Sequence, residues 1–219
     1  MKKAEQKASS IFTMLMAIVL ALGIGFMPNA QYAFADDVGS TGEGTVSTVS
    51  FPDVTDETPH KADIEWLAAN GITTGFPNGN FEPLQNVARA DMAAFLYRLA
   101  GSPAYEVTDE DMAAFTDVDE NTPHLKEVCW LASTGISTGF PDGSFQPYAQ
   151  IARCDMAAFL YRVAGSPAYE VTDEDMAAFT DVDENTPHLK EVCWLASTGI
   201  STGFPDGSFQ PYAQIVRCD

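Results

Sequence analysis

The sequence predicts a mainly α-helical protein made of three tandem helix–loop–helix repeats. A Phe-x-Asp-Val motif starts at residues 51, 115 and 179, so similar segments follow one another at a period of 64 residues. Residues 100–155 and 164–219 are identical except at one position. Within each segment, apolar residues recur at helical spacing on either side of a glycine-rich loop. A fixed period of this length is typical of arrays in which adjacent units supply one another's core.

The first helix of a repeat is expected over about residues 61–70 in the first copy. Ile64, Leu67 and Ala68 have the i, i+3, i+4 spacing of a face that packs on a core. Gly71 follows, and glycine often ends a helix by adopting the left-handed conformation. We therefore expect a short amphipathic helix at the start of each copy.

The rest of the repeat is expected to be a glycine-rich loop followed by a second helix. A short extended segment over residues 72–76 leads into the turn 77–80, in which Gly79 supplies positive φ. The second helix is expected over about residues 88–100, because four apolar residues from Met92 onward have the spacing i, i+3, i+4, i+7.

The connection between copies, residues 102–114, is acidic. Its apolar end, Met112-Ala-Ala-Phe115, is expected to form one helical turn. The third copy stops at Asp219, which aligns with Asp155 of the second copy. Its second helix lacks the apolar stripe, so we expect a truncated third repeat, either because the natural chain continues or because the reading frame ends early.

The N-terminus has the pattern of an export signal. Three lysines within the first ten residues precede an apolar run from Ile11 to Phe26, and Ala33-Phe34-Ala35 has the form of a cleavage site. The run is shorter than the ~20 residues that span a bilayer, which favours cleavage after Ala35 over an uncleaved anchor, with no membrane insertion afterwards. The expected organisation is a signal peptide (1–35), a flexible linker (36–50) and repeats at 51–114, 115–178 and 179–219, the last incomplete.

Charge and composition exclude several classes of function. The chain carries 11 Lys and Arg against 31 Asp and Glu, a net charge of −20, so nucleic acid is not an expected partner. With 46% hydrophobic residues, the chain is too apolar to be a disordered acidic protein. An enzyme is not expected, because nearly identical copies would duplicate any catalytic pair and no single-copy His, Ser or Cys constellation follows residue 35. No cofactor is implied.

The motifs occur in a fixed order: Phe-x-Asp-Val, Gly-Ile-x-x-Gly-Phe, Pro-[Asn/Asp]-Gly-x-Phe-x-Pro and Met-Ala-Ala-Phe-Leu-Tyr-Arg. Over residues 51–219 this order resembles the S-layer homology (SLH) domain of Gram-positive cell-surface proteins. The resemblance implies a secreted, pseudo-threefold module held noncovalently on the cell wall by an anionic, often pyruvylated, secondary cell-wall polysaccharide. The alternatives are a structural surface-layer or adhesion protein that uses the repeats for protein–protein contacts, and the anchoring fragment of a larger cell-wall enzyme.

The family binds its ligand through the arginine of a Thr-Arg-Ala-Glu motif. In this chain the matching residues are Arg89, Arg153 and Arg217. Each stands at the expected start of a second helix, where free amides and the macrodipole attract an anion such as a pyruvyl carboxylate. Asp53 and its equivalents are the alternative, internal anions. The motif's threonine is replaced by Ala88, Ala152 and Val216 in the three copies, so Asn86 or Gln150 would have to substitute as the helix cap.

Two sets of aromatic residues are candidates for stacking on sugar rings. The tryptophans lie within the first helices, at a spacing that also suits the core, and the phenylalanines lie beside the glycine turns. They are Trp66, Trp130 and Trp194, and Phe76, Phe140 and Phe204.

Four cysteines occur as two pairs with a spacing of 25 residues, and the first copy has neither member. In an exported chain, this joint presence predicts the intra-repeat disulfides Cys129–Cys154 and Cys193–Cys218, each worth ~3 kcal/mol. A zinc site that adds His124 or His188 is the alternative, but the ligand spacing is not compact.

No other metal site is expected from the ligand pattern. Asp117-x-Asp119-x-Asn121 is similar to the opening of a calcium loop, but Thr122 stands where such a loop needs glycine and Val128 where it needs glutamate. The negative charge alone motivates one further hypothesis, in which a divalent cation bridges the carboxylates of the chain to those of an acidic polymer.

Overall fold

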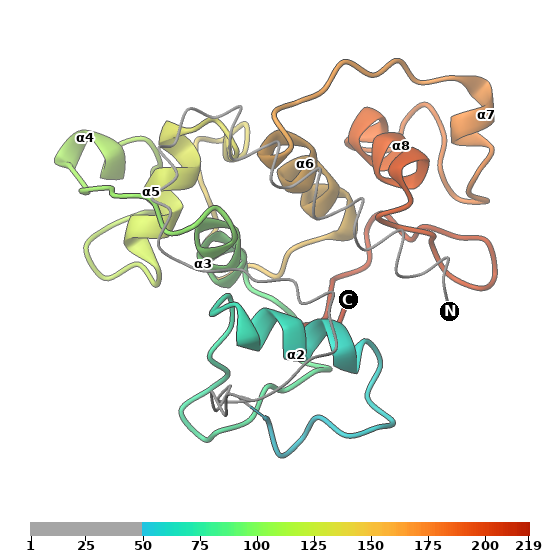
Figure 1. Cartoon of the computed structure of the whole chain (residues 1–219). Coiled ribbons are helices and arrows are strands. Elements are labelled where there is room, and N and C mark those ends of the chain that lie inside the picture. Colours follow the sequence, from blue (N-terminus) through green and yellow to red (C-terminus); the bar gives the residue numbers. More distant parts are fainter. Residues whose placement is uncertain (1–49) are drawn as a thin grey trace, which may run out of the picture.

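Helices joined by long loops make up the regular structure of residues 50–219, which are the residues that the computed structural model describes (Figure 1). The expected signal peptide and residues 36–49 of the linker lie outside this range. Among the described residues, β-type pairing is confined to isolated bridges. The helices are α2 (Lys61–Ala69), α3 (Arg89–Leu99), α4 (Asp109–Met112), α5 (Leu125–Ser133), α6 (Arg153–Val163), α7 (Asp173–Met176) and α8 (Leu189–Thr198).

The expected helix–loop–helix order is confirmed in the first two copies. Helices α2 and α3 begin and end within one residue of the expected positions. In the loop between them, Gly79 has φ +84° and its N–H donates to the Phe76 carbonyl at 2.9 Å, which closes the predicted turn. The mainly helical prediction is therefore correct for the described residues.

The short helix between copies forms one turn earlier than expected. α4 covers Asp109–Met112, because the Thr108 side chain accepts a hydrogen bond from the Asp111 N–H while the Asp111 carboxylate accepts one from the Thr108 N–H. This reciprocal capping box stabilises the start of a helix at Thr108 rather than at Met112. The same arrangement recurs at α7.

The second helix of one copy packs against the first helix of the next copy. α3 pairs with α5, and α6 pairs with α8 (Figure 1). In the first pair the rings of Tyr97 and Trp130 meet edge to face, with centroids 5.3 Å apart, and Tyr161 meets Trp194 in the same way in the second pair. Each lobe of the protein is therefore built from two consecutive copies.

The segments that precede the second helices join the three copies at the centre. The Ile151 N–H donates to the Val87 carbonyl at 3.0 Å, the Ile215 N–H donates to the Ile151 carbonyl at 3.1 Å, and the Val87 N–H donates to the Ile215 carbonyl at 3.1 Å. The third copy thus bonds back to the first, and the hydrogen bonds form a closed cycle. All three side chains are buried, so this cycle lies in the core.

The start of α3 is capped by backbone atoms of the next copy. The Arg89 and Ala90 N–H groups donate to the carbonyls of Ala149 and Pro147 at 2.9 and 3.0 Å. The expectation that Asn86 or Gln150 caps this helix is wrong, because their side-chain amides bond to each other at 2.7 Å. The missing threonine is explained, since the helix amides already have partners from the neighbouring loop.

All four cysteines are buried and free, so the expected disulfides Cys129–Cys154 and Cys193–Cys218 are not formed in the structure. Cys129 lies in the cluster between α3 and α5, whereas Cys154 lies in the cluster between α6 and α8. The pairs are separated because each first helix packs on the preceding copy's second helix and not on its own. Burial raises the pKa of Cys129, Cys154 and Cys193 to about 11, which keeps these thiols protonated at neutral pH.

Candidate functional site

Each of the three candidate arginines points from one copy into aromatic residues of the next. The Arg89 guanidinium carbon lies 4.5, 5.1 and 5.4 Å from the ring centroids of Phe140, Phe145 and Phe159. These distances are typical of cation–π contacts. We call this cluster the Arg89 site, and it also contains Asp155.

The same cluster is repeated at the other two junctions between copies. At the Arg153 site, the Arg153 guanidinium carbon lies 4.6 and 4.9 Å from the ring centroids of Phe204 and Phe209. The Arg217 site closes the cycle, because its guanidinium lies over Phe76, Phe81 and Phe95 of the first copy at 4.5, 4.6 and 5.3 Å. The structure therefore brings together every predicted arginine and every predicted phenylalanine, always across a junction.

Each arginine is held by a loop carbonyl of the next copy. The Arg89 Nε donates to the Phe145 carbonyl at 2.8 Å, and the equivalent bonds at Arg153 and Arg217 measure 2.8 and 2.6 Å. The same loop is fixed by Asp117, whose carboxylate accepts from the Phe145 and Gln146 N–H groups at 2.7 and 2.8 Å. The Phe-x-Asp-Val aspartate thus orders the loop that positions the arginine, and it is not the arginine's ion-pair partner.

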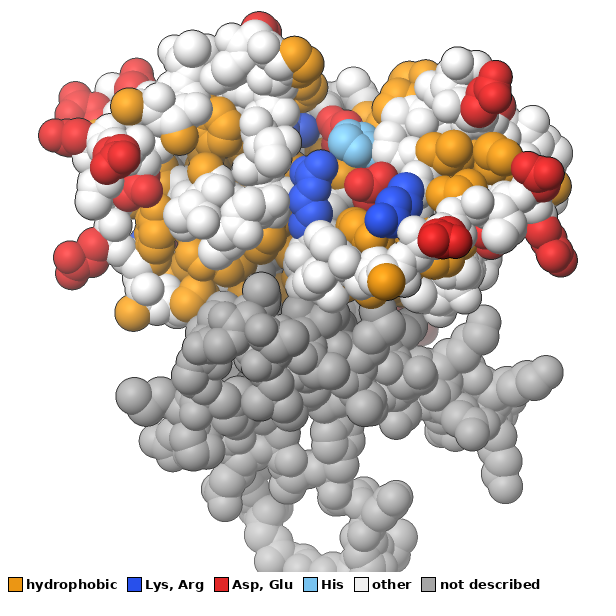
Figure 2. All heavy atoms as spheres, turned by 90° about the horizontal axis from the view of Figure 1, so that it is seen from above, with side chains coloured by type: hydrophobic (Ala, Val, Ile, Leu, Met, Phe, Trp, Pro, Cys, Tyr) orange, Lys and Arg blue, Asp and Glu red, His pale blue; other side chains and the backbone are white. Residues whose placement is uncertain are grey.

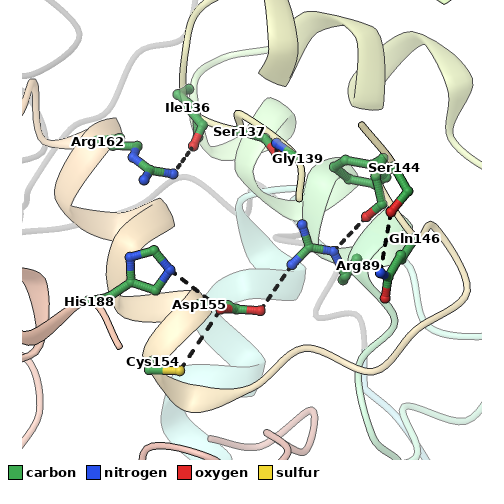
Figure 3. Close-up of polar contacts among 11 residues, drawn as sticks. Arg89, Ile136, Ser137, Gly139, Ser144, Gln146, Cys154, Asp155, Arg162 and His188 are labelled. Atoms are coloured by element: carbon green, nitrogen blue, oxygen red, sulfur yellow. Dashed lines mark hydrogen bonds and ion pairs between the residues drawn. The ribbon is translucent and has the colours of Figure 1, made fainter. Parts of the chain in front are cut away.

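At the Arg89 site, the ion-pair partner of the arginine is Asp155. Its carboxylate lies 3.1 Å from Arg89 Nη1 and 3.6 Å from His188 Nε2, so it links three copies (Figure 3). The hydrogen bond from His188 and the charge of Arg89 lower the pKa of Asp155. With Asp155 in place, Arg89 is only 4% exposed. Its cation is paired inside the protein, so Arg89 is the least available of the three arginines.

The other two arginines are less fully paired. Arg153 Nη1 lies 4.0 Å from the Asp219 carboxylate, and no carboxylate within residues 50–219 forms an ion pair with Arg217. The equivalent of Asp155 at the Arg217 site is Asp91, which lies 3.4 Å from His124 Nε2. Burial lowers the pKa of all three arginines, Arg89 included, despite the opposing influence of nearby carboxylates. Arg153 and Arg217 differ from Arg89 in their weaker pairing and in being only partly buried.

The predicted tryptophans lie apart from these sites and differ in exposure. Trp130 and Trp194 are 3% and 5% exposed beneath the tyrosines of α3 and α6, so they are core residues and cannot present a ring to a sugar. Trp66 on α2 is 42% exposed. The interpretation of the tryptophans as core residues is therefore correct for two of the three copies.

Positive and negative side chains are unevenly distributed over the surface. Figure 2 shows Lys and Arg side chains gathered near the middle of one face beside a histidine, with most Asp and Glu side chains toward the edges. Arg98 and Arg162 have a different role, because each donates to a carbonyl of its own copy, at Ile72 and Ile136, at 3.2 Å. Figure 3 shows the bond from Arg162 to the Ile136 carbonyl.

Sequence reasoning missed Asp155 and the histidines His124 and His188. The Asp follows the arginine by two positions, a spacing typical of a helix-capping motif, although here it pairs with the arginine of the preceding copy. Among the described residues, no three His, Cys, Asp or Glu side chains are grouped so as to hold a metal ion. None of the helices in that range has the length and apolar character needed to cross a bilayer.

The chain belongs to the S-layer homology domain family, which it matches over residues 50–93, 114–157 and 178–217. These three segments correspond to the three copies and include all three arginines.

Several surface proteins are similar to this chain. Cell surface glycoprotein 1 of Acetivibrio thermocellus is 27% identical over 66% of this chain and 6% of its own length. The cellulosome-anchoring protein of the same organism is 25% identical over 75% of this chain and 38% of its own length. The surface-layer 125 kDa protein of Lysinibacillus sphaericus is 27% identical over 73% of this chain and 13% of its own length. The chain thus matches between 6% and 38% of the length of these relatives. The predicted cell-surface location is confirmed.

Proposed function

We propose that the chain is an exported anchor that holds itself on the cell wall noncovalently by binding acidic groups of a secondary cell-wall polysaccharide at the junctions between copies. The observation that carries this proposal is the state of Arg217, a half-buried guanidinium stacked on three aromatic rings with no ion-pair partner in residues 50–219. A family relative named as a cellulosome-anchoring protein supports an anchoring role.

The chemistry of the Arg217 and Arg153 sites suits a carboxylate attached to a sugar. A guanidinium and a carboxylate form strong, charge-assisted hydrogen bonds, and a pyruvyl group would supply such a carboxylate. The surrounding phenylalanine rings offer apolar contact to the sugar itself. The net charge of −20 does not prevent this, because at ~0.15 M salt the Debye length is ~8 Å and distant carboxylates are screened.

The three sites are not expected to contribute equally. At the Arg89 site, Asp155 already occupies the position that a ligand carboxylate would take. At the Arg153 site the equivalent Asp219 is 4.0 Å away, and at the Arg217 site the equivalent Asp91 pairs with a histidine instead. We therefore place ligand binding chiefly at Arg217 and Arg153.

Sedimentation with purified cell walls tests this proposal. Arg217→Ala is expected to weaken wall binding about tenfold, which corresponds to the loss of a charge-assisted hydrogen bond worth ~1.5 kcal/mol. The matched control is Lys190→Ala, which removes the same charge from an exposed position on α8. If both variants bind like the parent while melting normally, the Arg217 site does not bind the polymer.

Binding to walls stripped of their polysaccharide distinguishes a polysaccharide-binding anchor from the alternative, a surface-layer or adhesion protein that contacts other proteins. The surface-layer relative favours that second candidate. Retained binding to stripped walls would support protein–protein contacts and contradict polysaccharide binding. Binding that is unchanged by EDTA would exclude a bridging divalent cation.

A further inference from the structure

Large side chains at one equivalent position of all three copies are open to solvent. Tyr148 and Tyr212 are 72% and 71% exposed, and Leu84 at the same position of the first copy is 75% exposed. A single exposed apolar side chain is ordinary, but here the same position is open in every copy of a repeated fold. The two tyrosines are therefore a recurring surface feature, and the arginine contacts do not include them.

The backbone around each tyrosine is fixed by hydrogen bonds. Tyr212 lies between Pro211 and Ala213, whose carbonyls accept hydrogen bonds from the first two N–H groups of α6 at 3.0 and 2.9 Å. The residues on either side of Tyr148 bond to the start of α3 in the same way. A ring on a fixed backbone loses little conformational entropy when a ligand packs on it.

Each tyrosine belongs to the loop that also holds an arginine. The carbonyl of Phe209, three residues before Tyr212, accepts the hydrogen bond from Arg153 Nε at 2.8 Å. Tyr148 and Leu84 have the same relation to the other two arginines. One loop thus presents both a guanidinium contact and an exposed side chain, which suits a ligand that carries an acidic group on a sugar ring.

The surface beside this position is hollowed in the first copy. Leu84 and Pro83 line a hollow of about 240 Å³ together with five residues of the loop before α2, namely Asp53, Thr55, Glu57, Thr58 and Pro59. This volume is below the ~300–1,000 Å³ of pockets for drug-sized ligands, so it suits a single sugar ring. Burial lowers the pKa of Arg217 and the Asp53 charge opposes that shift, so the hollow adjoins the Arg217 site.

The rings that the sequence pattern predicts for sugar stacking are less available than these tyrosines. The phenylalanines beside the glycine turns each lie under a guanidinium carbon at 4.5 to 4.6 Å, so one face of every ring is already covered. Among the residues that the structure describes, the exposed aromatic side chains are Trp66, Tyr148 and Tyr212. Of these, only the tyrosines lie in the loops that hold the arginines.

We propose that Tyr212 and Tyr148 stack on pyranose rings of the wall polysaccharide, and that Tyr212 contributes more because Arg153 is less fully paired than Arg89. The inference rests on the proposed function and adds to it a sugar ring beside the acidic group. The C–H groups on one face of a pyranose pack on an aromatic ring, and the tyrosine hydroxyl bonds to a sugar hydroxyl at the edge. Leu84 supplies apolar contact alone.

Hydroxyl-radical footprinting tests the contact, using the chain from residue 36 onward and the polysaccharide released from the purified walls. The polysaccharide is expected to protect Tyr212 from oxidation, and Tyr148 less strongly. Tryptic peptides with the two tyrosines differ only at Ala152 and Val216, so mass spectrometry separates them. Trp66, which lies apart from the arginine sites, is the internal reference. Equal oxidation of Tyr212 with and without saturating polysaccharide would overturn the proposal.

Variants at the same position measure the size of the effect by titration calorimetry with this polysaccharide. Tyr212→Ala is expected to weaken binding about fivefold, whereas Tyr212→Phe retains the ring and should bind within about twofold of the parent. Tyr148→Ala is the matched control in an almost identical loop and should weaken binding less than about twofold, because Asp155 already pairs with Arg89. Leu84→Tyr should strengthen binding.

Failure of this inference is distinguishable from failure of the anchoring function. If Tyr212→Ala binds like the parent while Arg217→Ala binds more weakly, the arginine sites bind the polymer and the tyrosines do not stack on it. Tyr212→Phe that binds as weakly as Tyr212→Ala would also overturn stacking, because the ring would then contribute nothing. A parent chain that does not bind the polysaccharide contradicts both proposals.

Discussion

The Arg89 and Arg217 sites contain the same kinds of residue but leave their arginines in different states. Both guanidinium groups lie over three phenylalanine rings and donate to a loop carbonyl of the next copy. At the Arg89 site, Asp155 adds an ion pair at 3.1 Å, whereas at the Arg217 site the equivalent Asp91 pairs with His124. The position of one aspartate therefore distinguishes a guanidinium with an ion pair from one that has none within residues 50–219.

The largest expected effect comes from removing the charge of that aspartate. Asp155→Asn leaves the Arg89 guanidinium buried without its ion pair, and such a change typically costs about 3 kcal/mol of unfolding free energy. Asp91→Asn is the matched change at the Arg217 site and should cost less than about 1 kcal/mol, because the half-exposed Asp91 contacts His124 and acts on Arg217 only through its nearby charge, without an ion pair. Urea unfolding of the two variants measures the difference. Equal losses would show that the two sites are equivalent after all.

A smaller effect is expected in the pH dependence of stability. The pKa of Asp155 is lowered by the hydrogen bond from His188 and the charge of Arg89, with the Cys154 thiol as a further neighbour. Because the folded pKa lies below the unfolded value of about 3.9, the stabilisation is complete above that value and is lost as the pH falls through the folded pKa.

Unfolding free energies of the parent and of Asp155→Asn, measured from pH 6 down to pH 2, test this dependence. The gap between the two proteins should narrow below about pH 4, since protonation of the parent removes the charge that the variant lacks. A gap that stays constant over this range would mean that Asp155 does not carry its charge into the Arg89 site.

The contrast between these sites also shows what the sequence could predict. Helical spacing identified α2 and α3 almost to the residue, and the recurring motifs identified the arginines and phenylalanines that meet at each junction. Periodicity shows which face of a helix is apolar but not which helix covers it. The pairing of α3 with α5 across two copies, and the role of Asp155 toward an arginine of the preceding copy, depend on that choice of partner.

The expected disulfides were wrong for the same reason, because the sequence does not show which helix packs against which. The smallest predicted effect is that of a reducing agent on stability. Cys129 packs between α3 and α5 while Cys154 packs between α6 and α8, so oxidation within a copy would have to join different lobes. A reducing agent should therefore leave the urea midpoint unchanged, and thiol titration of the unfolded chain should detect all four cysteines. Two intact disulfides would instead lower stability on reduction by ~3 kcal/mol each and would mean that the helices pair within a copy rather than between copies.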